Sequence, residues 1–210
     1  VLTDCFLLML VNSSELPLRV AVVGAGVAGS CAVYGLRRQA KDGLVSLTIF
    51  EAGCSSGGRF GTYWVRGRPG LRVDHGSPAI APRSDRFRDL CHQLCEIGAI
   101  IPAQRGAYGT LDEENRYTPI PNLEREEKIR YSSSLRGAAG FCEALLRGGD
   151  PAGVSLASQR FQTQVQEIRR ASPRSWQVFG EHGSLGNFHW LIVSTPALSN
   201  QHDSKLADDD

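Results

Sequence analysis

The chain has 210 residues, a formal net charge of +1 and six cysteines. This length is sufficient to bury a substantial hydrophobic core, in one large domain or somewhat more. A charge so close to zero gives no indication of a nucleic-acid or membrane partner, and we expect neither. The few cysteines are not a disulfide scaffold for a chain of this size, so we expect an intracellular protein, in the cytoplasm or an organelle.

Residues 1–18 are interpreted as a leader of unclear role. Their apolar stretch, Phe6–Val11, is far shorter than the ~20 residues that span a bilayer. It also lacks the positively charged flank of a secretory signal peptide. We therefore place these residues outside the predicted domain.

A glycine-rich turn comes next, with the sequence Gly24-Ala25-Gly26-Val27-Ala28-Gly29. The apolar run before it, Val20–Val23, predicts a buried parallel strand. Gly24 allows the tight turn, Gly26 lets the backbone approach a pyrophosphate, and Gly29 lets the next helix pack against the strand. That helix is predicted over about 27–39, and its N-terminal amides suit a diphosphate.

A second strand is predicted at Val45–Phe50, and Glu51 follows it directly. An acid at this offset accepts hydrogen bonds from the ribose hydroxyls of a dinucleotide. The strand, turn, helix and acid therefore predict a dinucleotide site, to which we also assign Ala25, Ala28 and Ala52. A glycine-rich turn in an unrelated α/β protein is the alternative, and it leaves Glu51 without a role.

A second glycine signal, Gly57-Gly58-Arg59, lies six residues beyond Glu51. Two glycines permit another close approach of backbone to phosphates, and Arg59 adds a fixed charge with a fork of donors. A simple nicotinamide-binding unit does not require this loop, so FAD is favoured as the cofactor. The alternative is a flexible surface turn with a solvated arginine.

Later elements are predicted from apolar periodicity and helix-capping signals. They are a short strand at 63–65, helices over 84–98 and 134–147, and strands near 153–157, 161–169, 175–180 and 187–194. Ser84 is the expected N-cap of the first of these helices, and Gly148-Gly149 is expected to end the second.

Cys91 and Cys95 would share one face of the helix over 84–98, with His92 between them. A structural zinc ion requires four ligands, and no second ligand pair is evident in the sequence. We therefore expect these cysteines to be thiols in the core and expect no metal.

The two glycine runs together, Gly-x-Gly-x-x-Gly and then Glu-Ala-Gly-x-x-x-Gly-Gly-Arg, resemble the flavin amine oxidase superfamily. Later segments are similar to its renalase-like branch, and the likeness covers about 19–197. They are Val73–Ile80, Phe161–Ile168, Trp176–Val178 and Leu191–Ala197. The resemblance implies an α/β fold with a Rossmann-like FAD-binding domain around a parallel sheet. It also implies an α+β substrate domain, of which this chain holds an incomplete portion.

The resemblance implies further contacts with the cofactor. It places Gly76 and Ser77 close to the flavin and Val165 close to the adenine. Ser77 and Pro78 stand where Ala and Gln are usual in the family, so backbone contacts rather than side-chain contacts are expected there. Because a flavin performs the redox chemistry itself, we assign no catalytic residue, and we expect His75 to be packed or solvated.

Renalase-like proteins oxidise dihydronicotinamide compounds and pass the electrons through FAD to oxygen. We therefore expect an FAD-dependent oxidoreductase that acts on an amine or a dihydronicotinamide-like small molecule. One alternative is an NAD(P)-dependent dehydrogenase that uses only the first glycine run. Another is a truncated, non-catalytic product without a cofactor, because proteins that resemble this chain are longer. The sequence does not indicate the oligomeric state.

Five segments are expected along the chain. They are the leader at 1–18, the FAD-binding βαβ unit with its Gly-Gly-Arg loop at 19–82, an insert on the substrate side at 83–147, a return to the nucleotide-binding domain at 148–197, and an acidic tail at 198–210.

Overall fold

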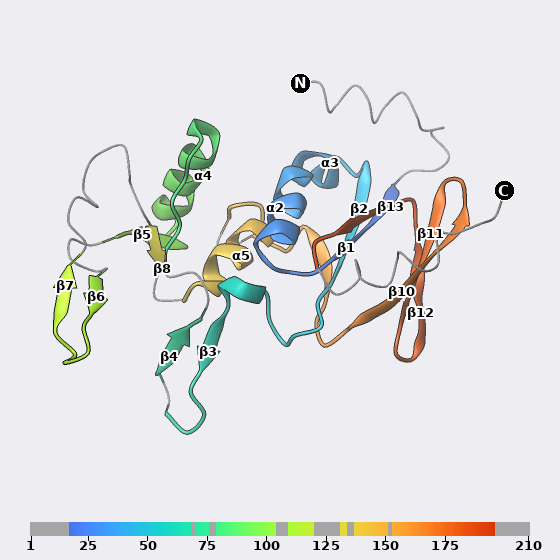
Figure 1. The fold of residues 1–210 in the computed structure, drawn as a ribbon. Coiled ribbons are helices and arrows are strands. Elements are labelled where there is room, and N and C mark those ends of the chain that lie inside the picture. Colours follow the sequence, from blue (N-terminus) through green and yellow to red (C-terminus); the bar gives the residue numbers. More distant parts are fainter. Residues whose placement is uncertain are drawn as a thin grey trace.

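The computed structural model describes residues 17–68, 70–75, 79–103, 109–119, 131–133, 137–150 and 153–195. These residues are arranged around a parallel sheet of four strands in the order β13-β1-β2-β9 (Figure 1). The strands are β1 (Leu18–Val23), β2 (Val45–Phe50), β9 (Ala157–Arg160) and β13 (Trp190–Val193). This is the Rossmann-like α/β fold that the sequence predicts. Its first two strands lie where they were expected, except that β1 already begins at Leu18, which we had assigned to the leader.

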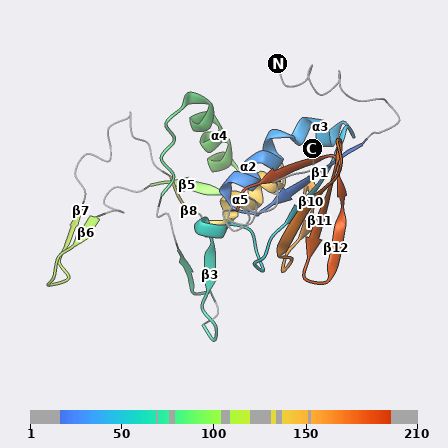
Figure 2. The same cartoon turned by 45° about the vertical axis from the view of Figure 1, so that its right-hand side comes forward.

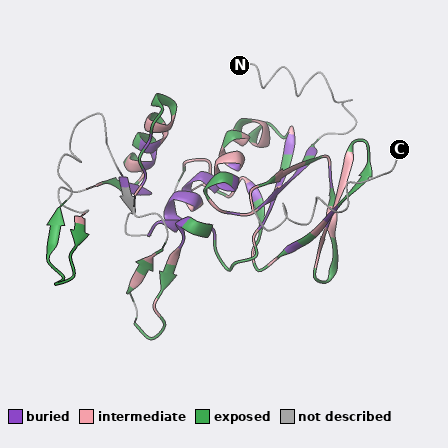
Figure 3. Ribbon diagram, in the orientation of Figure 1, coloured by how far each residue is buried: buried purple, intermediate pink, exposed green. Residues whose placement is uncertain are grey.

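Strand β1 lies inside the sheet and is buried on both faces. Val20 and Val22 pack into the cluster that lies under the helices, while Ala21 and Val23 pack into the cluster on the opposite face. A strand covered on both sides must be apolar at nearly every position, which explains the unbroken apolar run. Figure 3 shows the burial that results along the sheet.

Helices α2 (Val27–Gly35), α3 (Arg37–Lys41) and α5 (Ala139–Leu146) belong to the first face. The single helix predicted over 27–39 is therefore two helices, which are separated at Leu36. α5 is almost wholly buried and is followed by Gly148 and Gly149, both with positive φ, as expected for a helix stop. It begins at Ala139 rather than at residue 134, and residues 134–136 lie outside the described part of the chain.

The opposite face of the sheet is covered by an antiparallel sheet of β10 (Val165–Ser172), β11 (Ser175–Gly180) and β12 (Gly183–Phe188). Phe188 meets Phe50 edge to face, with 5.8 Å between the ring centroids. The predicted strands near 153–157 and 161–169 begin later than expected, at Ala157 and Val165.

The strand predicted over 187–194 is two strands, because the chain crosses from one sheet to the other at His189. The Arg19 amide donates to His189 Nδ1 and the His189 amide donates to the Arg19 carbonyl, both at 2.8 Å. These bonds fix the crossing point beside β1, and β13 then continues in the parallel sheet.

A second body of the structure is formed by α4 (Asp85–Glu96) and the strand pair β5 (Ile100–Pro102) and β8 (Tyr131–Ser133). Ser84 is the N-cap of α4, as predicted, and its Oγ accepts a hydrogen bond from the Phe87 amide at 3.3 Å. The apolar face of α4 packs with α5 in one cluster that includes Cys91 and Cys95, as the periodicity predicts.

Two hairpins project from the body, as Figures 1 and 2 show from two directions. They pair β3 (Thr62–Trp64) with β4 (Arg72–Asp74) and β6 (Gly109–Leu111) with β7 (Tyr117–Pro119). No helix among the described residues is long and apolar enough to cross a membrane.

The β3–β4 hairpin is fastened to the start of α5. Asp74 Oδ1 accepts hydrogen bonds from the Ala138 amide at 2.8 Å and from Thr62 Oγ1 at 2.6 Å, and Thr62 Oγ1 accepts from the Ala139 amide at 3.1 Å. The N-cap residue of α5, Ala138, has no side chain that can cap the helix. The hairpin therefore supplies the acceptors that these helix amides need.

We predict that Asp74→Ala lowers the free energy of unfolding by about 1–3 kcal/mol, because the Ala138 amide loses its acceptor. Urea unfolding of the whole chain measures this change. Asp85→Ala is the matched control, since it removes an exposed carboxylate at the start of α4 and should cost only about 0.5 kcal/mol. Equal losses in the two variants would contradict the proposed capping.

Candidate functional site

The turn between β1 and α2 requires glycine at two positions. Gly24 has a φ of +99°, and a Cβ atom there would lie 2.7 Å from Ser194 Oγ. A Cβ atom on Gly29 would overlap the carbonyl oxygen of Gly24. Both glycines are therefore needed for α2 to start this close to the end of β1, as the sequence predicts for Gly29.

Gly26, by contrast, is not required by the fold of the described residues. Its φ of −74° is open to any residue, and it is the N-cap of α2. Apart from its two chain neighbours, the only described atom within 4 Å of an added Cβ is the carbonyl oxygen of Gly57, at 3.7 Å, which is an ordinary contact distance. The missing side chain therefore leaves open space at the start of the helix.

The first turn of α2 presents backbone amides that no described side chain caps. In an α-helix the amides of its first residues, here Val27, Ala28 and Gly29, have no partner within the helix. The first turn also contains no acidic residue, and Ala28 is exposed. This helix end therefore suits an anionic group such as a diphosphate.

Glu51 lies at the end of β2, next to the turn. Its Oε2 accepts a hydrogen bond from the Ala25 amide at 2.8 Å, and its Oε1 accepts one from the Gly53 amide at 2.7 Å. The carboxylate is therefore held in place from both sides. Each oxygen retains a lone pair that can accept from a hydroxyl group. Ala52, the next residue, is exposed beside it.

The second glycine loop lies against the first. The Gly57 amide donates to the Ala25 carbonyl at 2.9 Å, and Gly57 forms a parallel bridge with Gly26. Gly57 has a φ of +124°, and a Cβ atom on Gly58 would lie 3.4 Å from the Cα of Gly26. The short helix η2 (Gly58–Phe60) follows, with Arg59 exposed on it. The structure thus brings together both predicted loops, with backbone rather than side chains between them.

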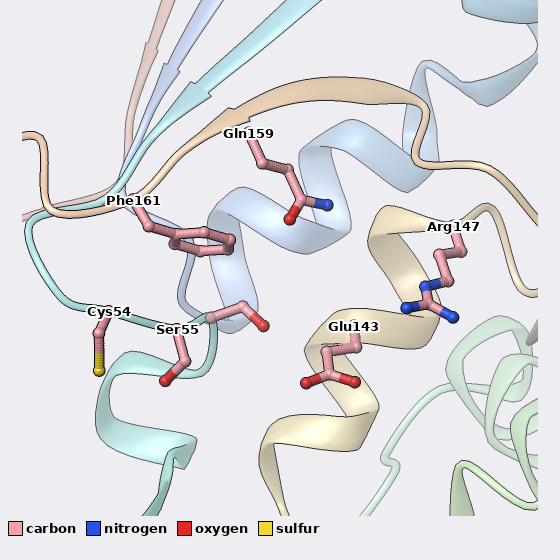
Figure 4. Close-up of a pocket in the computed structure, with 7 residues that line it drawn as sticks. Cys54, Ser55, Glu143, Arg147, Gln159 and Phe161 are labelled. Carbon is pink, nitrogen blue, oxygen red and sulfur yellow. The ribbon is translucent and has the colours of Figure 1, made fainter.

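A cavity of about 250 Å³ opens close to Glu51, where the chain leaves β2. The segment after β9 is joined to this region, because the amides of Gln162 and Thr163 donate to the carbonyls of Gly53 and Glu51, both at 2.8 Å. As Figure 4 shows, its lining comes from three separate parts of the chain, namely Cys54, Ser55 and Ser56 after β2, Glu143 and Arg147 on α5, and Gln159 and Phe161 at the end of β9.

Sequence reasoning identified none of these cavity residues. Glu143 and Arg147 carried no signal beyond a predicted helix, and Gln159 fell between two predicted strands. Only the three-residue stretch before Gly57 lies near a predicted motif. The cavity exists because α5 and β9 meet the loop after β2, which no local pattern reveals.

The structure describes only some of the further site residues that the family resemblance implies. Val165 is buried between the two sheets, at the first position of β10. Gly76 and Ser77 lie outside the described residues. His75 is exposed, and its amide donates to the Gly61 carbonyl at 3.1 Å, which brings it beside the second glycine loop.

The buried thiols are poorly suited to act as nucleophiles. Burial raises the pKa of Cys142 to about 12, although a hydrogen bond with Ser30 opposes this shift. Burial also raises the pKa of Cys91 to about 11, and the neighbouring Cys95 and Cys31 add to that effect. No group of three or more metal-ligating side chains that could hold a metal ion occurs among the described residues.

Comparison with known families matches residues 22–94 to an NAD(P)-binding Rossmann-like domain. This segment contains the glycine turn, Glu51, the second glycine loop and most of α4. No curated protein matches the chain in sequence.

Solved structures share the fold at low sequence identity. The crystal structure of the tetracycline destructase Tet(51) has a TM-score of 0.54 and 17% identity, over 93% of this chain and 42% of that one. A protein described as an FAD-containing monooxygenase, from Photorhabdus luminescens subsp. laumondii TTO1, has a TM-score of 0.50 and 16% identity, over 90% and 43%. The chain therefore spans less than half the length of either structure.

We predict that Gly29→Ala destabilises the protein by about 3 kcal/mol, because its methyl group overlaps the Gly24 carbonyl and forces α2 away from β1. Gly35→Ala is the matched control, since it lies in the same helix and, apart from its chain neighbours and the backbone of that helix, no atom lies within 4 Å of the added Cβ. That variant should be neutral or stabilising by up to about 1 kcal/mol. Similar unfolding midpoints for both variants would show that the close approach is not needed.

Proposed function

We propose that the chain is the nucleotide-binding part of an FAD-dependent oxidoreductase. The observation that carries this proposal is the open space beside Gly26. The fold does not require glycine at this position, so the absence of a side chain serves only to keep the space open. Uncapped helix amides, the second glycine loop and the fixed carboxylate of Glu51 surround that space. This is the set of groups that a dinucleotide diphosphate and its ribose require.

Two features favour FAD over a nicotinamide dinucleotide. The second loop brings Gly58 close to Gly26, and Arg59 is exposed on the following turn, where it can bind a phosphate oxygen. The fold is also similar to that of a protein described as an FAD-containing monooxygenase. Both features support the FAD cofactor that the resemblance of the two glycine runs also implies; neither bears on the finer family.

The cavity next to Glu51 suits the adenine end of the dinucleotide. It begins three residues beyond Glu51, so a ribose bound to that carboxylate would direct its base toward the cavity. Phe161 offers an aromatic ring for stacking, and the Gln159 amide offers both a donor and an acceptor to a base edge. The proposed site therefore extends from Arg59 through Gly26 and Glu51 to Phe161.

For the reaction, we propose the flavin-dependent oxidation of an amine or a dihydronicotinamide-like compound, with oxygen as the acceptor. The bound flavin would supply the redox chemistry, while the chain binds and orients it. Within that scheme, the α2 amides and Arg59 hold the diphosphate, and Glu51 holds the ribose. The substrate would lie on the side of α4 and the β3–β4 hairpin.

An NAD(P)-dependent dehydrogenase is the second candidate, because the matching family is described as NAD(P)-binding. It would use the first glycine turn and Glu51 but leave the second loop without a ligand. Titration of the purified chain with FAD and with NADH separates the two candidates. Tighter binding of NADH than of FAD would favour the dehydrogenase.

We predict that Gly26→Val lowers the affinity for FAD at least tenfold, because the branched side chain occupies the space that the diphosphate needs. Flavin fluorescence quenching measures the affinity, and thermal unfolding should show little change in stability. Gly35→Val is the matched control, with the same substitution in the same helix away from the site, and it should bind FAD normally. Equal affinity in the two variants would remove Gly26 from the site.

We also predict that Glu51→Gln weakens FAD binding by about 1.5–3 kcal/mol, because the hydrogen bonds from the ribose to a charged acceptor are lost. Isothermal titration of the variant and the unmodified chain measures the difference. Glu143→Gln serves as the control, because it removes the carboxylate that α5 contributes to the cavity, and it should lower FAD affinity less than Glu51→Gln does. An unchanged dissociation constant for Glu51→Gln would assign the ribose to another residue.

A further inference from the structure

Ser194 connects the last strand of the parallel sheet to the glycine turn. It follows β13 directly, and its hydroxyl lies 2.9 Å from the carbonyl oxygen of Val23 and 3.0 Å from that of Gly24. Its amide also donates to the Val23 carbonyl, at 2.9 Å. Because a hydroxyl has one proton, the two carbonyls share its donation.

The carbonyl of Gly24 is confined by this contact. It points into the narrow space next to Gly29, where even a methyl group would overlap it. On the other side of the turn, the Gly24 amide donates to the Phe50 carbonyl of β2 at 2.8 Å. The turn is thus hydrogen-bonded to β2 on one side and to Ser194, which follows β13, on the other.

The peptide group between Gly24 and Ala25 is held at both edges. A trans peptide is planar and directs its carbonyl and its amide in opposite directions. Ser194 binds the carbonyl edge, and the carboxylate of Glu51 binds the amide edge at 2.8 Å. A hydrogen bond donated to the carbonyl also polarises the amide and strengthens its bond to the acid.

We infer that Ser194 is a positioning residue for the dinucleotide site, acting on Glu51 through the Gly24–Ala25 peptide. The identity of the ligand rests on the proposed function, whereas the link from Ser194 to Glu51 rests on the contacts alone. Ser194 fixes the orientation of the peptide, the peptide fixes Glu51, and Glu51 holds the ribose. Ser194 thereby contributes to the proposed site through the Gly24–Ala25 peptide.

The test measures FAD affinity and amide exchange in Ser194→Ala. Affinity should fall about tenfold, and the Ala25 amide should exchange with deuterium at least tenfold faster in the protein without ligand. In the Glu51→Gln background the same substitution should change affinity less than twofold, because its effect passes through the carboxylate. A loss of affinity that is equal in both backgrounds would overturn the inference.

Ser172→Ala is the control, since Ser172 also binds the backbone through its hydroxyl, which accepts from the Arg174 amide at 3.3 Å, in the turn between β10 and β11 and outside the proposed site. It should alter neither FAD affinity nor Ala25 exchange. If the unmodified chain binds no FAD, the proposed function fails, but the exchange measurement still tests whether Ser194 orients the Gly24–Ala25 peptide. Unchanged Ala25 exchange in Ser194→Ala would then overturn the inference.

Discussion

The close contact between the end of β1 and the start of α2 is the constraint on which the site depends. The Gly24 carbonyl lies directly against Gly29, with no room for a side chain between them. Because the helix starts so close to the strand, its first amides lie at the carboxyl edge of the parallel sheet. Loops from neighbouring strands converge at this edge, so Glu51 and Gly57 meet the turn there. The same approach lets Val33 of α2 reach the cluster under the sheet.

The glycines of the turn divide into those that the fold needs and one that it does not. Gly24 and Gly29 satisfy a steric requirement of the protein itself, whereas Gly26 only preserves space. Around that space the polar contacts are mostly made by backbone: Glu51 binds two amides, and Gly57 binds the carbonyl of Ala25. Backbone groups within strands and tight turns lose little further entropy when a ligand binds. The proposed dinucleotide site, being built from them, would therefore be pre-organised for its ligand.

The β3–β4 hairpin and α4, which lie outside the parallel sheet, are connected to the cavity through α5. The β3–β4 hairpin is fastened to the first amides of α5 through Asp74 and Thr62. The partly buried Glu143 of α5 and Arg147 at its end line the cavity, while the buried residues of α5 pack against α4 in a cluster that contains Cys91 and Cys142. A single helix, α5, therefore connects the hairpin to the adenine end of the proposed site. Burial raises the pKa of both thiols, so they contribute packing there rather than reactivity.

The sequence by itself determined the elements whose cause is local. The apolar run of β1, the glycine turn, β2 with Glu51, and α4 with its Ser84 cap all follow from side-chain periodicity or from sterics within a few residues. Only the tertiary structure decided the partners that are distant in the chain. Ser194 meets Gly24 across 170 residues, α5 meets the loop after β2 at the cavity, and His189 divides one apolar stretch between two sheets. Periodicity reports which face of an element is buried, but it does not report what that face touches, since contacts between distant segments depend on how whole elements pack.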